Sequence, residues 1–532
     1  MSSRTSTSVF PLDRINASCP NTRSLELLKA AAIRFRLYLT IVCSPQSQIS
    51  ASVILSIRSR LDFIPDFFIG IIEPKLAIVV RAHDRVLNHI MESKTRIIIL
   101  GSGFGGLYTA LNLDKTIARD DDIEITLINR ENFFLFTPML HEVAASDLDI
   151  THIVSPVRKL LKRVKIFNGS VESIDLDAKL VHVSHGKEHH HHALDYDHLV
   201  LSLGSITNFY GNKGLEDNAL TMKSLGDAIY LRNHLISNLE EADFECCPKI
   251  REPLINYVVA GGGFAGVETI AGINDFLKEA LKFYPNLTKD MLRIVLVHAG
   301  DTILPELSEK LGKYSQKKLS ARGVEIHLNT KVAEVDGNRV TLSDGTELIT
   351  NTLIWTAGTA PNPLLEALPC NKERGKICAN EFMAVDGYDG VWAVGDSAAI
   401  VDPKTGRLYP PTAQHAIRQG KVLAHNIRVS IRGGKLKPFV FETIGQLAAL
   451  GRRTGVAQIM GINFSGFVAW WLWRTIYLLK LPRFEKKLRV ALDWTLDLMF
   501  TKDPVQFLTL RAPTVSNEEI PLPVRNYTAT AR

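Results

Sequence analysis

Two stretches of the chain repeat one pattern: a short apolar run, a glycine-rich turn, and apolar positions at helical spacing. In the first stretch, residues 96–100 (RIIIL) precede the turn at 101–106 (GSGFGG), and a second apolar run follows at 123–128. In the other stretch, residues 255–260 precede the turn at 261–266 (GGGFAG). Apolar runs of this length, bounded by glycine, are typical of buried strands in parallel sheets. The repeat predicts an α/β fold with two Rossmann-like βαβ units.

The spacing of the glycines matches a dinucleotide-binding turn in both units. The first glycine of such a turn permits the tight bend, the second lets the backbone approach a pyrophosphate, and the third allows close packing of helix and strand. The pyrophosphate then lies on free amides at the helix N-terminus. The alternative is that these glycines only ease a turn, but each follows a strand and opens a helix. The candidate residues are Gly101, Gly103, Phe104 and Gly106 for FAD, and Gly261, Gly263, Phe264 and Gly266 for NAD(P).

Later strands supply further candidates for the same sites. Residues 391–396 (VWAVGD) form an apolar run that ends in Gly395 and Asp396. In flavoproteins of this architecture such an aspartate binds the ribityl-phosphate part of FAD. Two further apolar runs end in glycine, residues 200–204 with Gly204 and residues 354–358 with Ala357 and Gly358. Such segments are typical of crossings between an FAD and an NAD domain.

Both units lack the carboxylate expected at the end of their second strand, where it would bind a ribose. Asn129, followed by Arg130, occupies this position in the first unit, and an amide still permits FAD binding. His298 occupies it in the second unit, with Asp301 nearby. Loss of the negative charge removes repulsion against a 2′-phosphate. We therefore expect NADH as co-substrate with NADPH also admissible.

Composition excludes several other classes of function. The chain has 532 residues, 46% of them hydrophobic and 22% charged, and a formal net charge of +6, which gives no reason to expect a nucleic-acid partner. Its six cysteines include no Cys-x-x-Cys pair, so neither a thiol relay nor an iron–sulfur cluster is expected. The four-histidine run at 189–192 is interpreted as a solvated hairpin loop, with metal binding as the alternative, and no metal site is predicted.

The two ends of the chain differ from the middle. Residues 1–60 are rich in Ser and Arg, which is typical of an organellar transit peptide but equally of a dispensable extension, the interpretation we favour. From Lys435 onward the chain becomes aromatic, basic and, by prediction, helical. No apolar stretch is long enough to span a bilayer, so amphipathic helices lying in the membrane interface are predicted. A helical pair packed on the protein itself, or a homodimer contact, is the alternative.

The chain resembles the two-dinucleotide flavoprotein superfamily, and within it the type II (non-proton-pumping) NADH:quinone oxidoreductases. Besides both turns, the resemblance lies in residues 134–140 (FLFTPML), 354–361 and 411–420 (PTAQHAIRQG). It implies that FAD contacts Thr137, Val171 and Gln414, and that Glu268 and Gln414 are catalytic, with Glu268 beside the nicotinamide and flavin. It further implies a quinone pocket at Gln414, Ile417 and Arg418, although relatives often carry Gln in place of Arg418.

The predicted domains follow from these assignments. Residues 1–93 form an extension, 94–220 with 352–432 a discontinuous FAD domain, 221–351 an inserted NAD(P)H domain, and 433–532 the membrane-associating region. The resemblance implies a respiratory NADH dehydrogenase that reduces quinone as a peripheral protein on the cytoplasmic face of the cell membrane. An organellar inner membrane replaces this location if residues 1–60 are a transit peptide. A sulfide:quinone oxidoreductase, another flavin-dependent reductase and a redox-sensing binding protein remain as alternatives.

Overall fold

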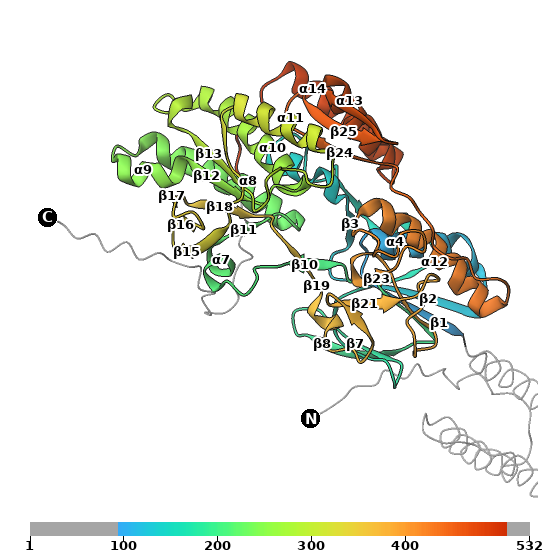
Figure 1. Cartoon of the computed structure of the whole chain (residues 1–532). Helices are drawn as coiled ribbons and strands as arrows, with labels where there is room; N and C mark the ends of the chain where they lie inside the picture. The colour runs from blue at the N-terminus through green and yellow to red at the C-terminus, as the bar shows by residue number, and fades with distance from the viewer. Residues whose placement is uncertain (1–93, 508–532) are drawn as a thin grey trace, which may run out of the picture. The chain divides into compact units, whose positions relative to one another are not determined.

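A computed structural model of the chain describes residues 94–507. The predictions made for residues 1–93, including the transit peptide, and for 508–532 lie outside the described residues. The described part contains two five-stranded parallel sheets, each with a glycine-rich turn next to its central strand, and a C-terminal module of a small sheet and two helices (Figure 1).

The first sheet has the strand order β22-β9-β1-β2-β5, and all its pairings are parallel. Its central strand β1 buries the run Ile97–Leu100 completely or almost so. The helix after the glycine turn packs against a helix from much later in the chain, so that two segments far apart in sequence lie side by side in this domain (Figure 1). The elements of this domain are β1 (Thr95–Leu100), α4 (Phe104–Lys115), β2 (Ile123–Asn129), β5 (Lys165–Asn168), the meander β6 (Ser170–Asp175), β7 (Leu180–His185) and β8 (His190–Asp195), β9 (His198–Leu201), β22 (Val391–Ala393) and α12 (Ala413–Arg432).

The second sheet repeats this arrangement with the order β11-β18-β12-β13-β14, again with parallel pairing throughout. Its turn joins the central strand β12 to helix α10, as the first turn joins β1 to α4. The predicted pair of Rossmann-like units is confirmed. The elements of the second domain are β11 (Leu220–Thr221), α8 (Leu225–Phe244), β12 (Asn256–Ala260), α10 (Phe264–Ala280), β13 (Arg293–Val297), α11 (Glu309–Ala321), β14 (Val324–His327), the meander β15 (Val332–Asp336), β16 (Arg339–Leu342) and β17 (Glu347–Ile349), and β18 (Thr352–Trp355).

The predicted boundary between residues 351 and 352 is one strand too early. β18 lies in the second sheet, between β11 and β12, and not in the first sheet. The chain instead crosses between the domains at a two-stranded antiparallel link of β10 (Ser205–Thr207) and β19 (Thr359–Pro361). An apolar run such as that of β18 fits the centre of either sheet, and only strand pairing decides between them.

The expectation of a helical tail from Lys435 onward is also corrected. Three antiparallel strands come first, β24 (Gly445–Ala449), β25 (Gly455–Ile459) and β26 (Ile462–Gly466), followed by the expected helices α13 (Phe467–Lys480) and α14 (Phe484–Met499). Glycine and alanine are weak strand formers, so the strands leave little signal in the sequence. No helix within 94–507 has the length and apolar character needed to cross a bilayer.

The histidine run lies at a hairpin, but only His189 is in the loop to which the prediction assigned the whole run. His189 has a positive φ of 48° in the turn between β7 and β8, and His190, His191 and His192 start β8 with exposed side chains.

Candidate functional site

The first glycine turn has the geometry of a phosphate cradle. Gly101 has a φ of +95°, and a Cβ on Gly106 would lie 2.0 Å from the Gly101 carbonyl oxygen. A Cβ on Gly103, by contrast, would meet no atom within 4 Å. Gly103 is also the N-cap of α4, and its helix end carries no side-chain capping bond. Free amides therefore face open space at the positive end of a helix, which suits a pyrophosphate.

The second turn repeats these features. Gly261 has a φ of +121°, and a Cβ on Gly266 would lie 1.8 Å from the Gly261 carbonyl oxygen. Gly263 is the N-cap of α10, again without a side-chain cap. The nearest atom to a Cβ at Gly263 would be Oε1 of Glu306, at 3.9 Å. The backbone of Ala357, a predicted NAD(P) contact, borders this turn, since its amide nitrogen would lie 2.9 Å from a Cβ on Gly261.

Asn129 and His298, which replace the expected acids, play matching roles. The Ser102 amide donates to Asn129 Oδ1 over 2.9 Å, and the Gly262 amide donates to His298 Nδ1 over 3.1 Å. Each side chain therefore orders its glycine turn as an acceptor without a negative charge. Burial lowers the pKa of His298, so that the imidazole is neutral at pH 7. Arg130 is exposed next to Asn129.

Asp396 lies beside the crossing segment, and the neighbouring Gly395 borders the first turn, since its amide nitrogen would lie 3.7 Å from a Cβ on Gly105. Ser205 Oγ donates to Asp396 Oδ2 over 2.6 Å, and Lys223 Nζ donates to Ser205 Oγ over 2.8 Å. The Gly204 amide donates to Ser397 Oγ over 3.1 Å. Burial lowers the pKa of Lys223, and the Asp396 carboxylate opposes this shift. Sequence reasoning missed Lys223, because only the crossing brings it to Asp396.

A cavity of about 520 Å³ lies where the two turn-bearing helices, α12 and the C-terminal module meet. It brings together eight of the predicted residues: Phe104, Thr137, Phe264, Glu268, Gly358, Gln414, Ile417 and Arg418. It also adds lining residues that the sequence analysis did not single out, among them His141, Lys223, Gln446, Tyr477 and Lys480.

The other predicted residues lie away from the cavity. Val171 is paired with Val183 in the β6–β7 hairpin and does not line the cavity. The six glycines of the two turns, together with Asn129, Arg130, Gly204, His298, Ala357, Gly395 and Asp396, are also outside its lining. They border the turns, the crossings and the strand ends, as expected for ligands much longer than the cavity.

Glu268 is a buried carboxyl group in the cavity wall. The indole Nε1 of Trp473 donates to its Oε1 over 2.9 Å, and the Ala449 amide donates to the same oxygen over 3.1 Å. Its Oε2 lies 3.7 Å from Nδ1 of His141. Burial raises the pKa of Glu268 to about 8, and the two hydrogen bonds oppose the rise. Glu268 therefore exchanges a proton near neutral pH, which a simple helix-end carboxylate does not do.

Gln414 and Arg418 stand together on the first turns of α12. Arg418 NH1 donates to the Gln414 carbonyl over 2.9 Å, and its guanidinium lies 4.0 Å from the ring centroid of Phe441. Gln414 Nε2 donates to the Gly445 carbonyl over 3.3 Å, which joins α12 to β24. This wall of the cavity thus combines an amide, a cation and the apolar Ile417.

The cavity lining contains no cysteine among the described residues. Cys370 and Cys378 lie beside or within the small hairpin of β20 (Lys372–Glu373) and β21 (Lys376–Ala379), and burial raises the pKa of both thiols. A high pKa keeps a thiol protonated and unreactive.

Known families and structures match this architecture. The family model described as pyridine nucleotide-disulphide oxidoreductase matches residues 95–420, and the NDH2 C-terminal domain model matches residues 444–503. The type II NADH:quinone oxidoreductase Ndh of Mycobacterium tuberculosis is 32% identical over 76% of this chain and 89% of its own length. The chain belongs to the type II NADH:quinone oxidoreductases. The resemblance inferred from the sequence is therefore confirmed.

Other relatives agree with this assignment. A type II NADH:quinone oxidoreductase of Staphylococcus aureus is 30% identical over 70% of this chain and 92% of its own length. The structure of NDH2 from Plasmodium falciparum in complex with NADH has a TM-score of 0.73, with 20% identity over 77% of this chain and 100% of that chain. The sulfide:quinone oxidoreductase of Aquifex aeolicus has a TM-score of 0.57 at 17% identity, a likeness of fold only, and does not favour that alternative.

Proposed function

We propose that this chain oxidises NADH and passes the two electrons through FAD to a membrane quinone without pumping protons. The observation that carries the proposal is one cavity in which the helices of both glycine turns meet Glu268, Gln414 and the C-terminal module. A bound flavin supplies the redox chemistry, since it accepts hydride from NADH and returns electrons to the quinone. The protein binds, orients and holds protons.

The first turn is assigned to FAD and the second to the nicotinamide nucleotide. Gly103 offers free amides to one pyrophosphate, and Asp396, on the second half of the same domain, binds the ribityl-phosphate part. Gly263 offers the equivalent amides to the exchanging nucleotide. We expect NADPH to be admitted as well, because the neutral His298 itself carries no negative charge, but the nearby carboxylates of Asp301 and Glu306 keep NADH preferred.

The quinone is assigned to the wall formed by Gln414, Ile417 and Arg418. Reduction of a quinone to a quinol consumes two protons. Glu268 is protonated over part of the neutral range and lines the same cavity, so we assign it a role in proton handling. The cations Arg418 and Lys480 add positive charge to this wall.

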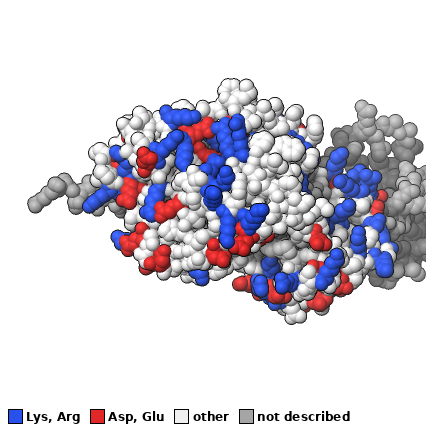
Figure 2. All heavy atoms as spheres, turned by 45° about the horizontal axis from the view of Figure 1, so that its top comes forward, with Lys and Arg blue, Asp and Glu red and all other residues white. Residues whose placement is uncertain are grey.

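Membrane attachment is assigned to the outer faces of α13 and α14. These helices expose large apolar side chains, including Trp471, Leu479, Phe484 and Leu492. Figure 2 presents a face on which surface without charged side chains lies beside clustered Lys and Arg. Trp with flanking basic residues suits the interface of a membrane. The cytoplasmic face of the cell membrane is the proposed location, with an organellar inner membrane if residues 1–60 are a transit peptide. A homodimer contact through the same apolar face is the alternative use.

Anaerobic mixing of the purified full-length protein tests the function. NADH is added first, then a soluble quinone, while the flavin absorbance is followed. We expect bleaching by NADH and full recovery with the quinone. A colourless protein that binds no added FAD, or a reduced flavin that quinone does not reoxidise, contradicts the proposal.

A further inference from the structure

Trp473 ties the C-terminal module to the cavity. It lies on α13 and is fully buried, on the face of the helix that also carries the buried Ala469 and Trp470. The opposite face exposes Phe467 and Trp471. A buried indole N–H needs an acceptor, and here that acceptor is Oε1 of Glu268, 2.9 Å away on α10 of the NAD domain.

Two donors of the C-terminal module meet on one oxygen of Glu268. Besides Trp473, the backbone amide of Ala449 in β24 donates to Oε1 over 3.1 Å. Oε1 therefore has both of its acceptor positions occupied. The other oxygen, Oε2, lies on the side of His141, which lines the cavity as Glu268 does. The carboxyl group is thus held in one orientation from outside the two dinucleotide domains.

The remaining ionisable groups around Glu268 do not replace these donors. Helix α5 (Leu140–Ala144) contributes His141 and Glu142. Burial lowers the pKa of His141 to about 3, so that its imidazole is neutral, and Glu142 is an acid and brings no positive charge. From α13, burial raises the pKa of Tyr477, so that it stays uncharged. The cations Lys223, Arg418 and Lys480 line the same cavity. The effects resolved on Glu268 are burial, which raises its pKa to about 8, and the two N–H donors, which oppose that rise.

We propose that Trp473 is a positioning residue for quinone reduction: its indole N–H orients the Glu268 carboxyl group so that Oε2 faces the cavity. This role rests on the proposed function, in which Glu268 handles a proton. The bond also favours the ionised carboxylate, so it lowers the pH at which Glu268 releases its proton. The C-terminal module in this view completes the catalytic site in addition to its part in membrane attachment.

The test compares Trp473→Phe with Trp470→Phe in the full-length, flavin-loaded protein. Both variants keep an aromatic ring in a buried position of α13, and only the first loses the donor to Glu268. The infrared C=O band of the protonated carboxyl group, identified by its absence in Glu268→Gln, is followed against pH. We expect Trp473→Phe to raise the proton affinity of Glu268 about tenfold, as loss of a hydrogen bond to a charged group predicts. Trp470→Phe should leave it unchanged.

The same variants are compared in two further measurements. If protonated Glu268 supplies a proton, quinone reduction falls as pH rises through its pKa, and this fall should move to higher pH in Trp473→Phe alone. If that variant does not fold, the wild-type protein labelled with 5-fluorotryptophan replaces it: one ¹⁹F resonance should titrate together with the Glu268 band and lose its pH dependence in Glu268→Gln. An unmoved band, an equal shift in Trp470→Phe, or no titrating resonance overturns the role of Trp473. A failure of the proposed function is different, because then the wild-type flavin is not bleached by NADH or not reoxidised by quinone.

Discussion

The glycines of the first turn differ in what a side chain would meet. At Gly106 a Cβ would lie 2.0 Å from a backbone carbonyl oxygen, whereas at Gly103 it would enter open space. Gly103 has a φ of −68°, which any residue adopts. The fold therefore requires glycine at position 106, and only the ligand requires it at position 103.

A pair of substitutions separates these two requirements. Gly106→Ala is expected to lower the free energy of unfolding by about 1–3 kcal/mol, since strand and helix must move apart. Gly103→Ala should leave the thermal unfolding of the apoprotein unchanged but lower its affinity for FAD at least about tenfold, because the methyl group occupies the approach of the pyrophosphate. Flavin absorbance relative to protein and thermal unfolding measure the two effects. Full flavin content in Gly103→Ala would place the cofactor elsewhere.

Glu142 resembles Glu268 in being a buried acid that accepts from an indole. Trp494 Nε1 donates to Glu142 Oε2 over 3.1 Å, and burial raises the pKa of Glu142 to about 8, although the nearby Arg474 lowers it. A carboxyl group with a raised pKa keeps its proton in the folded state at pH values where the unfolded chain loses it. The folded state is therefore disfavoured progressively as pH rises from the unfolded pKa of about 4.5 towards 8.

Glu142→Gln should remove this pH dependence, because an amide keeps the acceptor for Trp494 without a titrating group. We expect the variant to gain stability relative to the wild type between pH 5 and pH 8, and to show little gain at pH 4. Chemical unfolding at a series of pH values measures the difference. A gain that is the same at every pH would assign the effect to packing rather than to ionisation.

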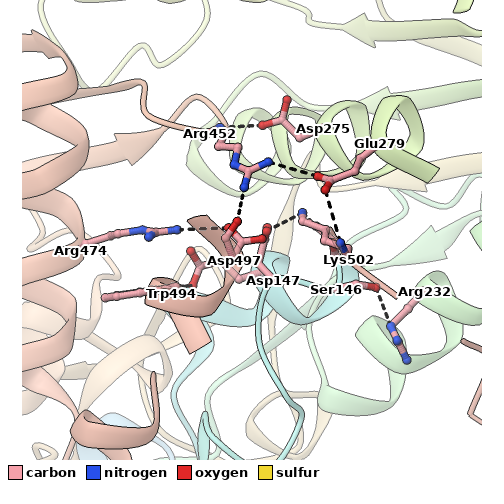
Figure 3. A network of polar contacts seen from close by, with 12 residues as sticks. Ser146, Asp147, Arg232, Asp275, Glu279, Arg452, Arg474, Trp494, Asp497 and Lys502 are labelled. Atoms are coloured by element: carbon pink, nitrogen blue, oxygen red, sulfur yellow. Dashed lines mark hydrogen bonds and ion pairs between the residues drawn. The ribbon is translucent and has the colours of Figure 1, made fainter. Parts of the chain in front are cut away.

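The segment that follows α14 is held to the dinucleotide domains by an ion pair and hydrogen bonds of Lys502, whereas Asp497 of α14 contacts Arg452 and Arg474 within the C-terminal module (Figure 3). The Lys502 ammonium group pairs with Asp147, which follows α5, and donates to the Ala145 carbonyl over 3.0 Å. The backbone amide of Lys502 donates to Oε1 of Glu279 on α10 over 3.3 Å. Arg452 lies in the turn between β24 and β25, and its Nη1 is 3.4 Å from Oε2 of Glu279. These contacts join three segments distant in sequence around the C-terminal module.

Lys502→Ala should be strongly destabilising. The side chain is only 5% exposed, so its loss leaves the Asp147 carboxylate buried without its partner, at a cost of about 3–5 kcal/mol. Arg339→Ala is the control: it breaks the pair with Glu347, in which both side chains are about half exposed, and should cost less than about 1 kcal/mol.

A double variant identifies the cause of the Lys502 effect. Lys502→Met combined with Asp147→Asn removes both charges and should recover part of the lost stability. Differential scanning calorimetry of the four proteins measures the effect. Equal unfolding temperatures for Lys502→Ala and Arg339→Ala would show that the buried pair does not hold the module.

At the scale of the whole molecule, the C-terminal module presents one face to the dinucleotide domains and another outward. The inner face carries Trp473 and Trp494, and the outer face carries side chains such as Trp471, Leu488 and Leu492, each more than half exposed. Apolar groups of this size are costly to leave in water and favourable to bury in lipid.

Substitution of Trp471 and Leu492 by Glu is therefore expected to abolish binding to vesicles that contain anionic lipid, measured by co-sedimentation. Reduction of a soluble quinone analogue should remain near the wild-type rate, because neither residue lines the cavity. Undiminished vesicle binding, combined with a change of oligomeric state in size-exclusion chromatography, would favour the alternative of a homodimer contact.

Local sequence determined much of this protein, since the glycine turns, their flanking strands and the helices α13 and α14 follow from patterns within a few residues. The site around Glu268 depends on contacts that no local pattern encodes: Trp473, Ala449 and His141 reach it from three different segments. Likewise, strand pairing decides to which sheet β18 belongs. The crossing between the domains brings Lys223 into contact with Ser205, which in turn contacts Asp396. Periodicity and turn chemistry act between neighbours along the chain, whereas hydrogen-bond partners and burial are set by packing between distant segments.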